Sequence, residues 1–186
     1  KKNKNFVYLI SPNKIKNEKF YIKLNEVLSS KKVSFFQLRL KKTNSKNKIF
    51  IAKKIKKICR KHQVKLIVND DPIVAKKVNA DGCHLGQKDM NIYNARKLLK
   101  NKIIGVTCHN SLNLVKKGIR EGANYIALGA FYSSKTKKTK YKASLKILSF
   151  AKKLTNIPIV AIGGIKDTNY KKLLLNKANF LAISGY

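Results

Sequence analysis

Acidic residues gather in one short stretch of a strongly basic chain. Asp70, Asp71, Asp81 and Asp89 lie within 20 residues, although the 186-residue chain has only eight Asp and Glu residues and a formal net charge of +35. Carboxylates kept against such a background commonly bind a cation, and oxygen ligands of this kind suit Mg²⁺, often together with substrate phosphates. The stretch therefore predicts a divalent metal site and a phosphorylated substrate.

Two of these carboxylates follow consecutive strand-like runs. Asp70 comes directly after the apolar run 64–69, and Asp89 follows the next run, 81–85. Neighbouring parallel strands lie about 4.8 Å apart, so the two loops can bring Asp70 and Asp89 to one Mg²⁺. Asp71 has another interpretation, because an aspartate followed by proline is typical of a helix start in which the aspartate is the cap.

Residues that could bind phosphate follow the run 33–38. Gln37, Arg39 and Lys41 alternate with leucines, so their side chains share one face of an extended strand. Only four of the 43 basic residues are arginine, and a guanidinium grips phosphate oxygens in a bidentate manner that lysine cannot reproduce. Arg39 is therefore a candidate phosphate-binding residue, and a solvated strand end is the alternative interpretation.

Three later segments also suit phosphate. Residues 133–138 form a hydroxyl-rich basic loop in which Lys137 could neutralise charge that develops on a leaving group. Gly164 follows the seventh strand-like run and Ser184 ends the eighth, in positions that resemble the phosphate-binding loops of many barrels. Each segment is a weak signal alone, and their serial order strengthens the prediction.

Strand-like and helix-like segments alternate along the whole chain. Helical spacing of apolar residues is clearest over 46–62, 112–121 and 144–154. The strand-like runs are 6–10, 33–38, 64–69, 81–85, 103–107, 125–129, 157–162 and 180–184. Eight strands that alternate with helices predict an α/β fold, a single compact (β/α)8 TIM barrel over 1–186, with the closing C-terminal helix absent from this chain. A doubly wound sheet is the alternative, although it usually has fewer strands.

Polar residues follow nearly every predicted strand, which favours the barrel. Loops after the strands build the site at one rim of such a barrel. That rim would also receive Asn69, His84, Gln87, Thr107 and His109. We expect the two histidines to support the strand ends structurally.

The three cysteines are odd in number and widely spaced, which is typical of a reducing compartment and predicts a cytoplasmic protein. Cys83-His84 and Cys108-His109 suggest zinc, but adjacent strand residues point to opposite faces, so buried thiols are the better interpretation. No apolar run approaches the roughly 20 residues of a membrane span, and the run 6–10 is too short for a signal peptide.

Lysine is scattered along the whole chain and not gathered in a patch or tail. Such a distribution favours anionic substrates through long-range electrostatics. It does not predict a dedicated nucleic-acid partner, whose binding would need a concentrated basic footprint.

Together these motifs resemble the thiamine phosphate synthase family, from Val7 to Ser184. The resemblance rests on Gln37-Leu-Arg-Leu-Lys41, Val68-Asn-Asp-Asp71, residues 80–89, Gly105-Val-Thr-Cys-His109, Tyr125-Ile-Ala-Leu-Gly129, Thr136-Lys-Lys138 and Ala161-Ile-Gly-Gly-Ile165. The block Asp-Gly-x-His-Leu-Gly-Gln-x-Asp over 81–89 is the most specific of these motifs.

The resemblance implies a transferase of thiamine biosynthesis. A 4-amino-2-methyl-5-pyrimidinylmethyl diphosphate would join 4-methyl-5-(2-phosphoethyl)thiazole, or its carboxylated form, to give thiamine phosphate and pyrophosphate with Mg²⁺. By this resemblance Gln37, Arg39, Lys41, Asn69 and Lys137 would hold the pyrimidine diphosphate, with Thr107 in place of a family serine beside the pyrimidine. Ser134, Lys135, Thr136, Gly164, Ile183 and Ser184 would surround the thiazole phosphate. Asp70 and Asp89 would carry the magnesium, and Arg39, Lys41 and Lys137 would be catalytic.

Two alternatives stay open from the sequence. Thiazole tautomerases share the barrel, but they are expected to carry a histidine in the loop after the sixth strand, and Gly129-Ala-Phe-Tyr-Ser133 has none. A non-catalytic thiamine- or nucleic-acid-binding barrel is the other alternative, against which the joint presence of the acids and Arg39 argues. The expected partners are the two substrates, with no membrane and a homodimer left open.

Overall fold

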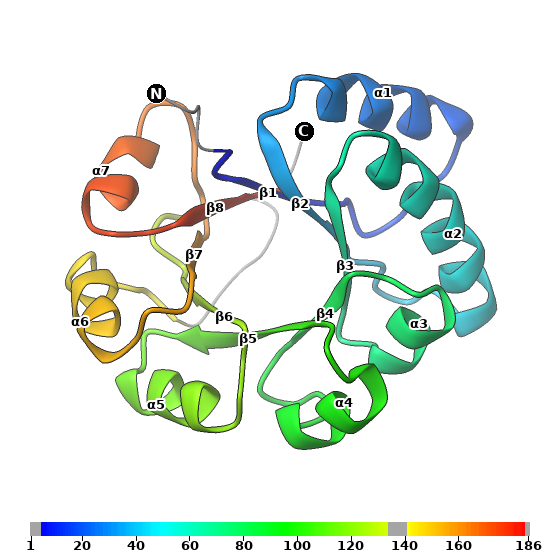
Figure 1. Ribbon diagram of the computed structural model, residues 1–186. Helices are drawn as coiled ribbons and strands as arrows, with labels where there is room; N and C mark the ends of the chain where they lie inside the picture. The colour runs from blue at the N-terminus through cyan, green and yellow to red at the C-terminus, as the bar shows by residue number, and fades with distance from the viewer. Residues whose placement is uncertain (1–4, 134–140, 185–186) are drawn as a thin grey trace.

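Eight parallel strands close into one barrel in the computed structural model, which describes residues 5–133 and 141–184 (Figure 1). The strands follow one another around the barrel in chain order, and β8 returns to pair with β1. They are β1 (Val7–Ile10), β2 (Val33–Leu38), β3 (Lys65–Asn69), β4 (Gly82–Leu85), β5 (Ile103–His109), β6 (Tyr125–Gly129), β7 (Ile159–Ile162) and β8 (Phe180–Ile183). The predicted (β/α)8 barrel is confirmed.

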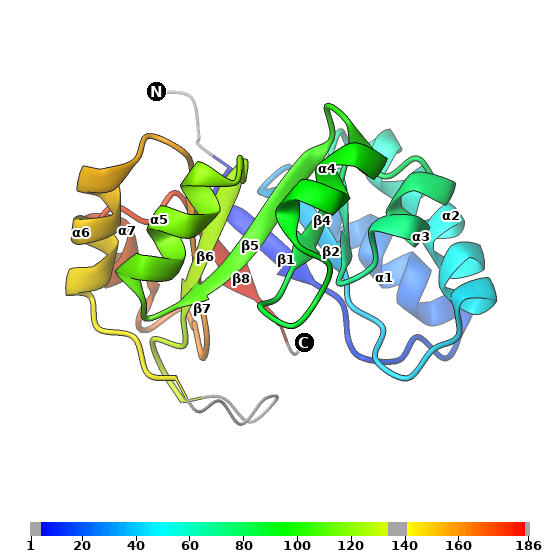
Figure 2. The same ribbon diagram turned by 90° about the horizontal axis from the view of Figure 1, so that it is seen from below.

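Helices surround the ring of strands on the outside, as the end-on and side views show (Figures 1 and 2). They are α1 (Glu18–Ser29), α2 (Ser45–Lys61), α3 (Pro72–Lys77), α4 (Ile92–Leu99), α5 (Leu112–Arg120), α6 (Lys146–Leu154) and α7 (Tyr170–Leu175). Among the described residues, no helix has the length and apolar character needed to cross a membrane.

Predicted and observed strand ends differ by at most two residues, and two of the differences have clear causes. β7 begins at Ile159, two residues later than predicted, because Pro158 has no N–H to donate to a neighbouring strand. β5 continues to His109, two residues beyond its predicted end, after a register shift between Thr107 and His109.

Side chains alternate between two apolar layers, as the pleat of a strand requires. One set packs under the helices and includes Leu9, Phe36 and Leu66. The other set fills the barrel interior and includes Tyr8 and Tyr125. Side chains of the second set and their strand neighbours determine what lies beneath the rim of the barrel.

The cysteines belong to the outer layer. Cys59, Cys83 and Cys108 are all free and buried, as predicted. His84 points into the barrel, whereas its neighbour Cys83 packs under the helices, so the two side chains diverge. Burial raises the pKa of the Cys59 and Cys108 thiols to about 12, and that of Cys83 is also raised, which keeps them in the protonated form that binds metals poorly.

Arg96 on α4 ties together two loops where β5 and β6 begin. Its Nη1 donates to the carbonyl oxygens of Lys100 and Lys102, each at 2.6 Å. Its Nη2 donates to the carbonyl of Gly122 at 3.0 Å and to Asn124 Oδ1 at 2.7 Å. Only the planar guanidinium can supply donors in all these directions at once, which explains an arginine where lysine is the rule.

We expect Arg96→Lys to lower the free energy of unfolding by about 2 kcal/mol, because an ammonium cannot replace this set of hydrogen bonds. Urea denaturation measures the change. Arg120→Lys, at an exposed position on α5, is the matched control and should stay within about 0.5 kcal/mol of the parent. Equal stability of the two variants would contradict the role given to Arg96.

Candidate active site

Side chains from four neighbouring strands meet inside the barrel near the ends of those strands. Gln37, Asn69, His84 and Thr107 occupy inward-facing positions on β2, β3, β4 and β5. Asn69 lies directly opposite His84 in the register of β3 and β4. The structure therefore brings the predicted residues Gln37, Asn69 and Thr107 to one rim.

A continuous hydrogen-bond chain runs through the barrel beneath this rim. Gln37 Nε2 donates to the Tyr8 hydroxyl at 3.0 Å, and the hydroxyls of Tyr8 and Tyr125 lie 2.7 Å apart. Tyr125 also contacts His84 Nδ1 at 2.9 Å, and His84 Nε2 contacts Thr107 Oγ1 at 2.9 Å. His84 thus supports the rim from below, as expected. Sequence reasoning missed the two tyrosines, because nothing local to either position indicates a polar partner.

Gly105 makes the contact between Tyr125 and His84 sterically feasible. These two residues come from β6 and β4, and β5 lies between them. A Cβ at Gly105 would lie 1.9 Å from the Tyr125 ring. With no side chain there, the Tyr125 ring stacks on the His84 imidazole, with centroids 5.6 Å apart and an interplanar angle of 18°.

The predicted metal residues Asp70 and Asp89 lie side by side at the same rim. Each carboxyl group shifts the pKa of the other, so the two groups lie close together. Asp70 Oδ2 accepts from Lys41 Nζ at 2.9 Å, and Asp89 Oδ2 accepts from the Gly86 N–H at 2.7 Å. Asp70 has a positive φ of 63°, a conformation that aspartate tolerates better than most residues and that often marks functional sites.

The two carboxyl groups titrate as a pair. Burial alone would raise the pKa of Asp70, but its hydrogen bonds with Lys41 and Asp89 bring that pKa below its usual value. Burial, and then the hydrogen bond with Asp70, raises the pKa of Asp89. Asp89 is therefore the more readily protonated of the two carboxyl groups, and a bound cation would favour its ionised form.

This donor set fits Mg²⁺. Two carboxylates are a common protein contribution to a magnesium site, which takes its other ligands from water and phosphate. Within residues 5–133 and 141–184, no cluster of three or more His, Cys, Asp or Glu side chains could hold a metal ion. The pair suits an ion that is shared with a phosphorylated ligand.

The other two acids of the stretch are structural. Asp71 caps α3, where its Oδ1 accepts from the Val74 N–H at 3.0 Å, which confirms the predicted helix start. Asp81 accepts from the Leu66 N–H at 2.9 Å, just before β4 begins and away from the rim.

Arg39 is held in place by the loop after β1. Its backbone N–H donates to Ser11 Oγ at 2.9 Å, and its Nη1 donates to Asn13 Oδ1. Arg39 itself is partly exposed at the end of β2. Ser11 and Asn13 were missed by sequence reasoning, because a polar loop residue gives no signal of a partner 28 or 26 residues away.

The loops after β6 and β7 pack closely against each other. Phe131 and Tyr132 donate their N–H groups to the carbonyls of Ile162 and Gly163, at 3.1 and 3.0 Å. Gly164 has a φ of 59°, and a Cβ there would lie 2.3 Å from the Ser133 carbonyl oxygen. Glycine is therefore required where these loops meet.

The remaining predicted phosphate residues divide into two groups. Ile183 ends β8 and is partly exposed, and Ser184 follows it as an exposed residue. The four positions that lie outside the described residues are Ser134, Lys135, Thr136 and Lys137.

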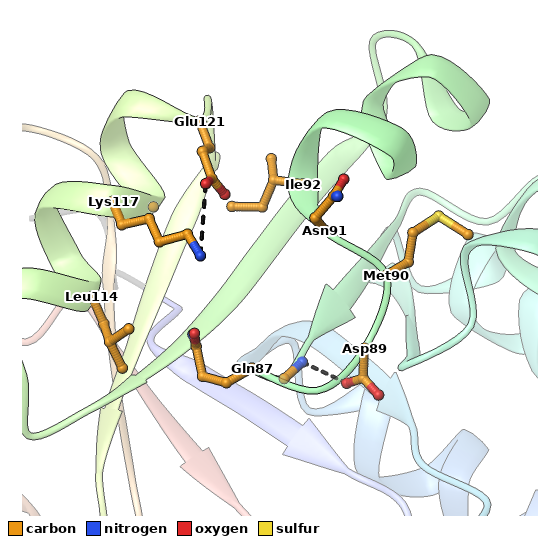
Figure 3. Close-up of a pocket in the computed structure, with 10 residues that line it drawn as sticks. Gln87, Asp89, Met90, Asn91, Ile92, Leu114, Lys117 and Glu121 are labelled. Atoms are coloured by element: carbon orange, nitrogen blue, oxygen red, sulfur yellow. Dashed lines mark hydrogen bonds and ion pairs between the residues drawn. The ribbon is translucent and has the colours of Figure 1, made fainter.

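A pocket of about 60 Å³ lies behind the loop that carries Asp89 (Figure 3). It opens between this loop and α5, and its walls include Ile92, Leu114 and the Lys117–Glu121 ion pair at 3.9 Å. Asp89 lies at one edge of the pocket, where its carboxylate turns back to the Gly86 N–H. The pocket lies outside the barrel and is not part of the rim.

Comparison with known proteins agrees with this geometry. A family model described as thiamine monophosphate synthase matches residues 7–185. The chain belongs to the thiamine monophosphate synthase family. It is 71% identical over 184 residues to a thiamine-phosphate synthase of Pelagibacter ubique, a match that covers 99% of this chain and 89% of that protein. It is 38% identical to one of Erythrobacter litoralis, covering 96% and 86%.

A solved structure supports the same conclusion. The thiamine phosphate pyrophosphorylase of Pyrococcus furiosus superposes with a TM-score of 0.85 at 28% identity, covering 97% of this chain and 86% of that one. This family member is therefore a transferase enzyme. The names of these relatives favour the synthase over the tautomerase alternative.

We expect Gly105→Ala to lower the free energy of unfolding by about 1–3 kcal/mol, because the new methyl group displaces the Tyr125 ring. Thermal denaturation measures the loss. The same substitution in a Tyr125→Leu background should cost less, since the ring is no longer there. An equal cost in both backgrounds would show that the ring is not what excludes a side chain at Gly105.

Proposed function

We propose that this chain condenses 4-amino-2-methyl-5-pyrimidinylmethyl diphosphate with 4-methyl-5-(2-phosphoethyl)thiazole, or with its carboxylated form with loss of CO2, and releases pyrophosphate. The observation that carries the proposal is the paired carboxyl groups of Asp70 and Asp89 beside Lys41, at the rim that also presents Gln37 and Thr107. Such a rim suits a substrate with a diphosphate at one end and a polar ring at the other. Family membership supports the same reaction.

The two substrates are assigned to different parts of the rim. Arg39 and Lys41 hold the diphosphate, with Lys137 as a third cation suggested by its position in the sequence. Gln37, Asn69 and Thr107 face the pyrimidine. The thiazole phosphate is assigned to the segment of Gly164, Ile183 and Ser184, together with Ser134, Lys135 and Thr136.

Charge stabilisation is the main task of these residues. The carbon–oxygen bond to the diphosphate breaks, and its electron pair leaves with the pyrophosphate. Arg39 and Lys41 stabilise the negative charge that develops there. The pyrimidine methyl carbon is left as a resonance-stabilised cation, and the thiazole nitrogen lone pair forms the new carbon–nitrogen bond. The chemistry thus needs positioning and charge more than a basic or nucleophilic side chain.

Asp70 and Asp89 are the residues that would hold magnesium. When bound, this ion supplies positive charge to the diphosphate oxygens. Lys41 already contacts Asp70 at 2.9 Å, so it can pass from the carboxylate to a phosphate oxygen when substrate arrives. Asp89 keeps its orientation through the Gly86 N–H.

The direct test is synthesis of thiamine phosphate from the two substrates. Purified protein is mixed with both substrates and Mg²⁺, and product is measured by chromatography with and without EDTA. Metal-dependent product is expected. A folded protein that makes no product with Mg²⁺ present would contradict the proposed reaction.

We expect Asp70→Asn and Asp89→Asn each to lower kcat/KM by on the order of 100-fold, because each removes one carboxylate from the metal site. Asp71→Asn is the matched control next in the chain, and it should cost about 1 kcal/mol of stability or less while turnover is kept. Steady-state assays over a range of Mg²⁺ concentrations separate the two effects. Near-normal turnover in both site variants would remove the metal assignment.

We expect Arg39→Lys to raise the KM for the pyrimidine diphosphate by about tenfold, because a point charge cannot replace a bidentate fork. The KM for the thiazole phosphate should change little. Arg60→Lys, at an exposed position near the end of α2, is the control. An unchanged KM for the diphosphate would exclude Arg39 as its ligand.

A further inference from the structure

The hydrogen-bond chain beneath the rim has one direction, which follows from counting hydrogens. Gln37 Nε2 can only donate, so the Tyr8 hydroxyl accepts from it. Tyr8 has a single hydroxyl hydrogen, and among the described residues its other hydrogen-bond partner is Tyr125. Tyr8 is fully buried, with 1% of its surface exposed, so an unused hydrogen would be costly. Tyr8 therefore donates to Tyr125.

The same count continues to the other end of the chain. Tyr125 accepts from Tyr8, and its own hydrogen then goes to His84 Nδ1. A neutral imidazole that accepts at Nδ1 carries its proton on Nε2. His84 Nε2 therefore donates to Thr107 Oγ1. The hydroxyl hydrogen of Thr107 is not used by any of these hydrogen bonds.

We propose that Tyr8, Tyr125 and His84 are positioning residues that leave the Thr107 hydroxyl hydrogen to donate into the mouth of the barrel. The substrate would then present an acceptor atom to Thr107, such as a ring nitrogen of the aminopyrimidine. This step rests on the proposed function. If the hydrogen bonds ran in the opposite direction, Thr107 would donate to His84. The Thr107 hydroxyl could then only accept a hydrogen bond from the substrate.

The surroundings keep this chain in one arrangement. The Phe35 ring contacts Tyr8, Tyr125 and Phe180, with centroids 5.4, 6.3 and 5.0 Å apart, and so covers the two tyrosines from below. Gly105 leaves the space that the Tyr125 ring needs to reach His84. Water is poorly placed to replace a missing partner there, so the direction set at Gln37 is carried through to Thr107.

The first test reads the direction without any substrate. The protein has three histidines, so a long-range ¹H–¹⁵N spectrum of the imidazoles is simple, and the His84→Gln variant assigns the His84 signals by their loss. We expect the Nε2–H tautomer for His84 in the unaltered protein. In Tyr125→Phe, which keeps the ring but removes the hydroxyl, the His84 Nδ1 signal should shift because Nδ1 no longer accepts a hydrogen bond. A proton on Nδ1 in the unaltered protein would overturn the proposal.

The second test asks whether the direction matters for the substrate. Tyr125→Phe should raise the KM for the pyrimidine diphosphate by about three- to tenfold and leave kcat and the KM for the thiazole phosphate nearly unchanged. A merely structural defect would lower kcat and leave the KM of each substrate unchanged. Tyr93→Phe removes an exposed hydroxyl on α4 and should behave as the unaltered protein.

Thr107 itself gives a further comparison. Thr107→Ser keeps a hydroxyl and should be clearly more active at low pyrimidine concentration than Thr107→Val, which keeps the shape and removes the donor. Equal activity of the two variants would contradict donation from Thr107. The spectrum needs no turnover, so it tests the hydrogen-bond direction independently of the proposed function. A protein that shows the expected tautomer but makes no product would refute the proposed function and leave the hydrogen-bond direction standing.

Discussion

Closure of eight parallel strands into a barrel is the constraint on which everything else depends. Because all strands run the same way, their carboxyl ends meet at one rim, and alternate residues on every strand point inward. Residues 37, 69, 84 and 107 are far apart in the chain but become neighbours there for this reason. The helices outside bury the other face of each strand and keep the ring closed.

A barrel interior is normally filled by apolar side chains, and here polar groups occupy part of it. Tyrosine suits this position, because its ring fills a large volume and its one hydroxyl can form hydrogen bonds with a neighbour. Gly105 is as important as the tyrosines themselves, because a methyl group at this position would separate Tyr125 on β6 from His84 on β4. The same side chains thus fill the barrel interior and satisfy its buried hydrogen-bonding groups.

The strong positive charge of the chain gives its few acids and arginines distinct tasks. Asp70 and Asp89 lie together beside Lys41, whereas Asp71 and Asp81 accept hydrogen bonds from backbone N–H groups. Arg96 satisfies carbonyl groups in two loops, in a geometry that lysine cannot reproduce. Scattered lysines elsewhere require no such partners, because water solvates their charge.

Local pattern by itself determined much of this protein. Short apolar runs and helical spacings placed the strands and three helices within about two residues, and the Asp-Pro pair correctly predicted the cap of α3, because these features depend on near neighbours in the chain. The predicted closeness of Asp70 and Asp89 is also confirmed, because the two residues follow strands that are neighbours in the barrel, and their metal role stays a prediction. Only the tertiary structure decided the contact of Tyr8 with Tyr125, 117 residues apart, the support of Arg39 by Asn13 and the need for Gly105. Those contacts depend on which side chains meet across a closed barrel. Spacing between residues that are near in the sequence carries no information about them.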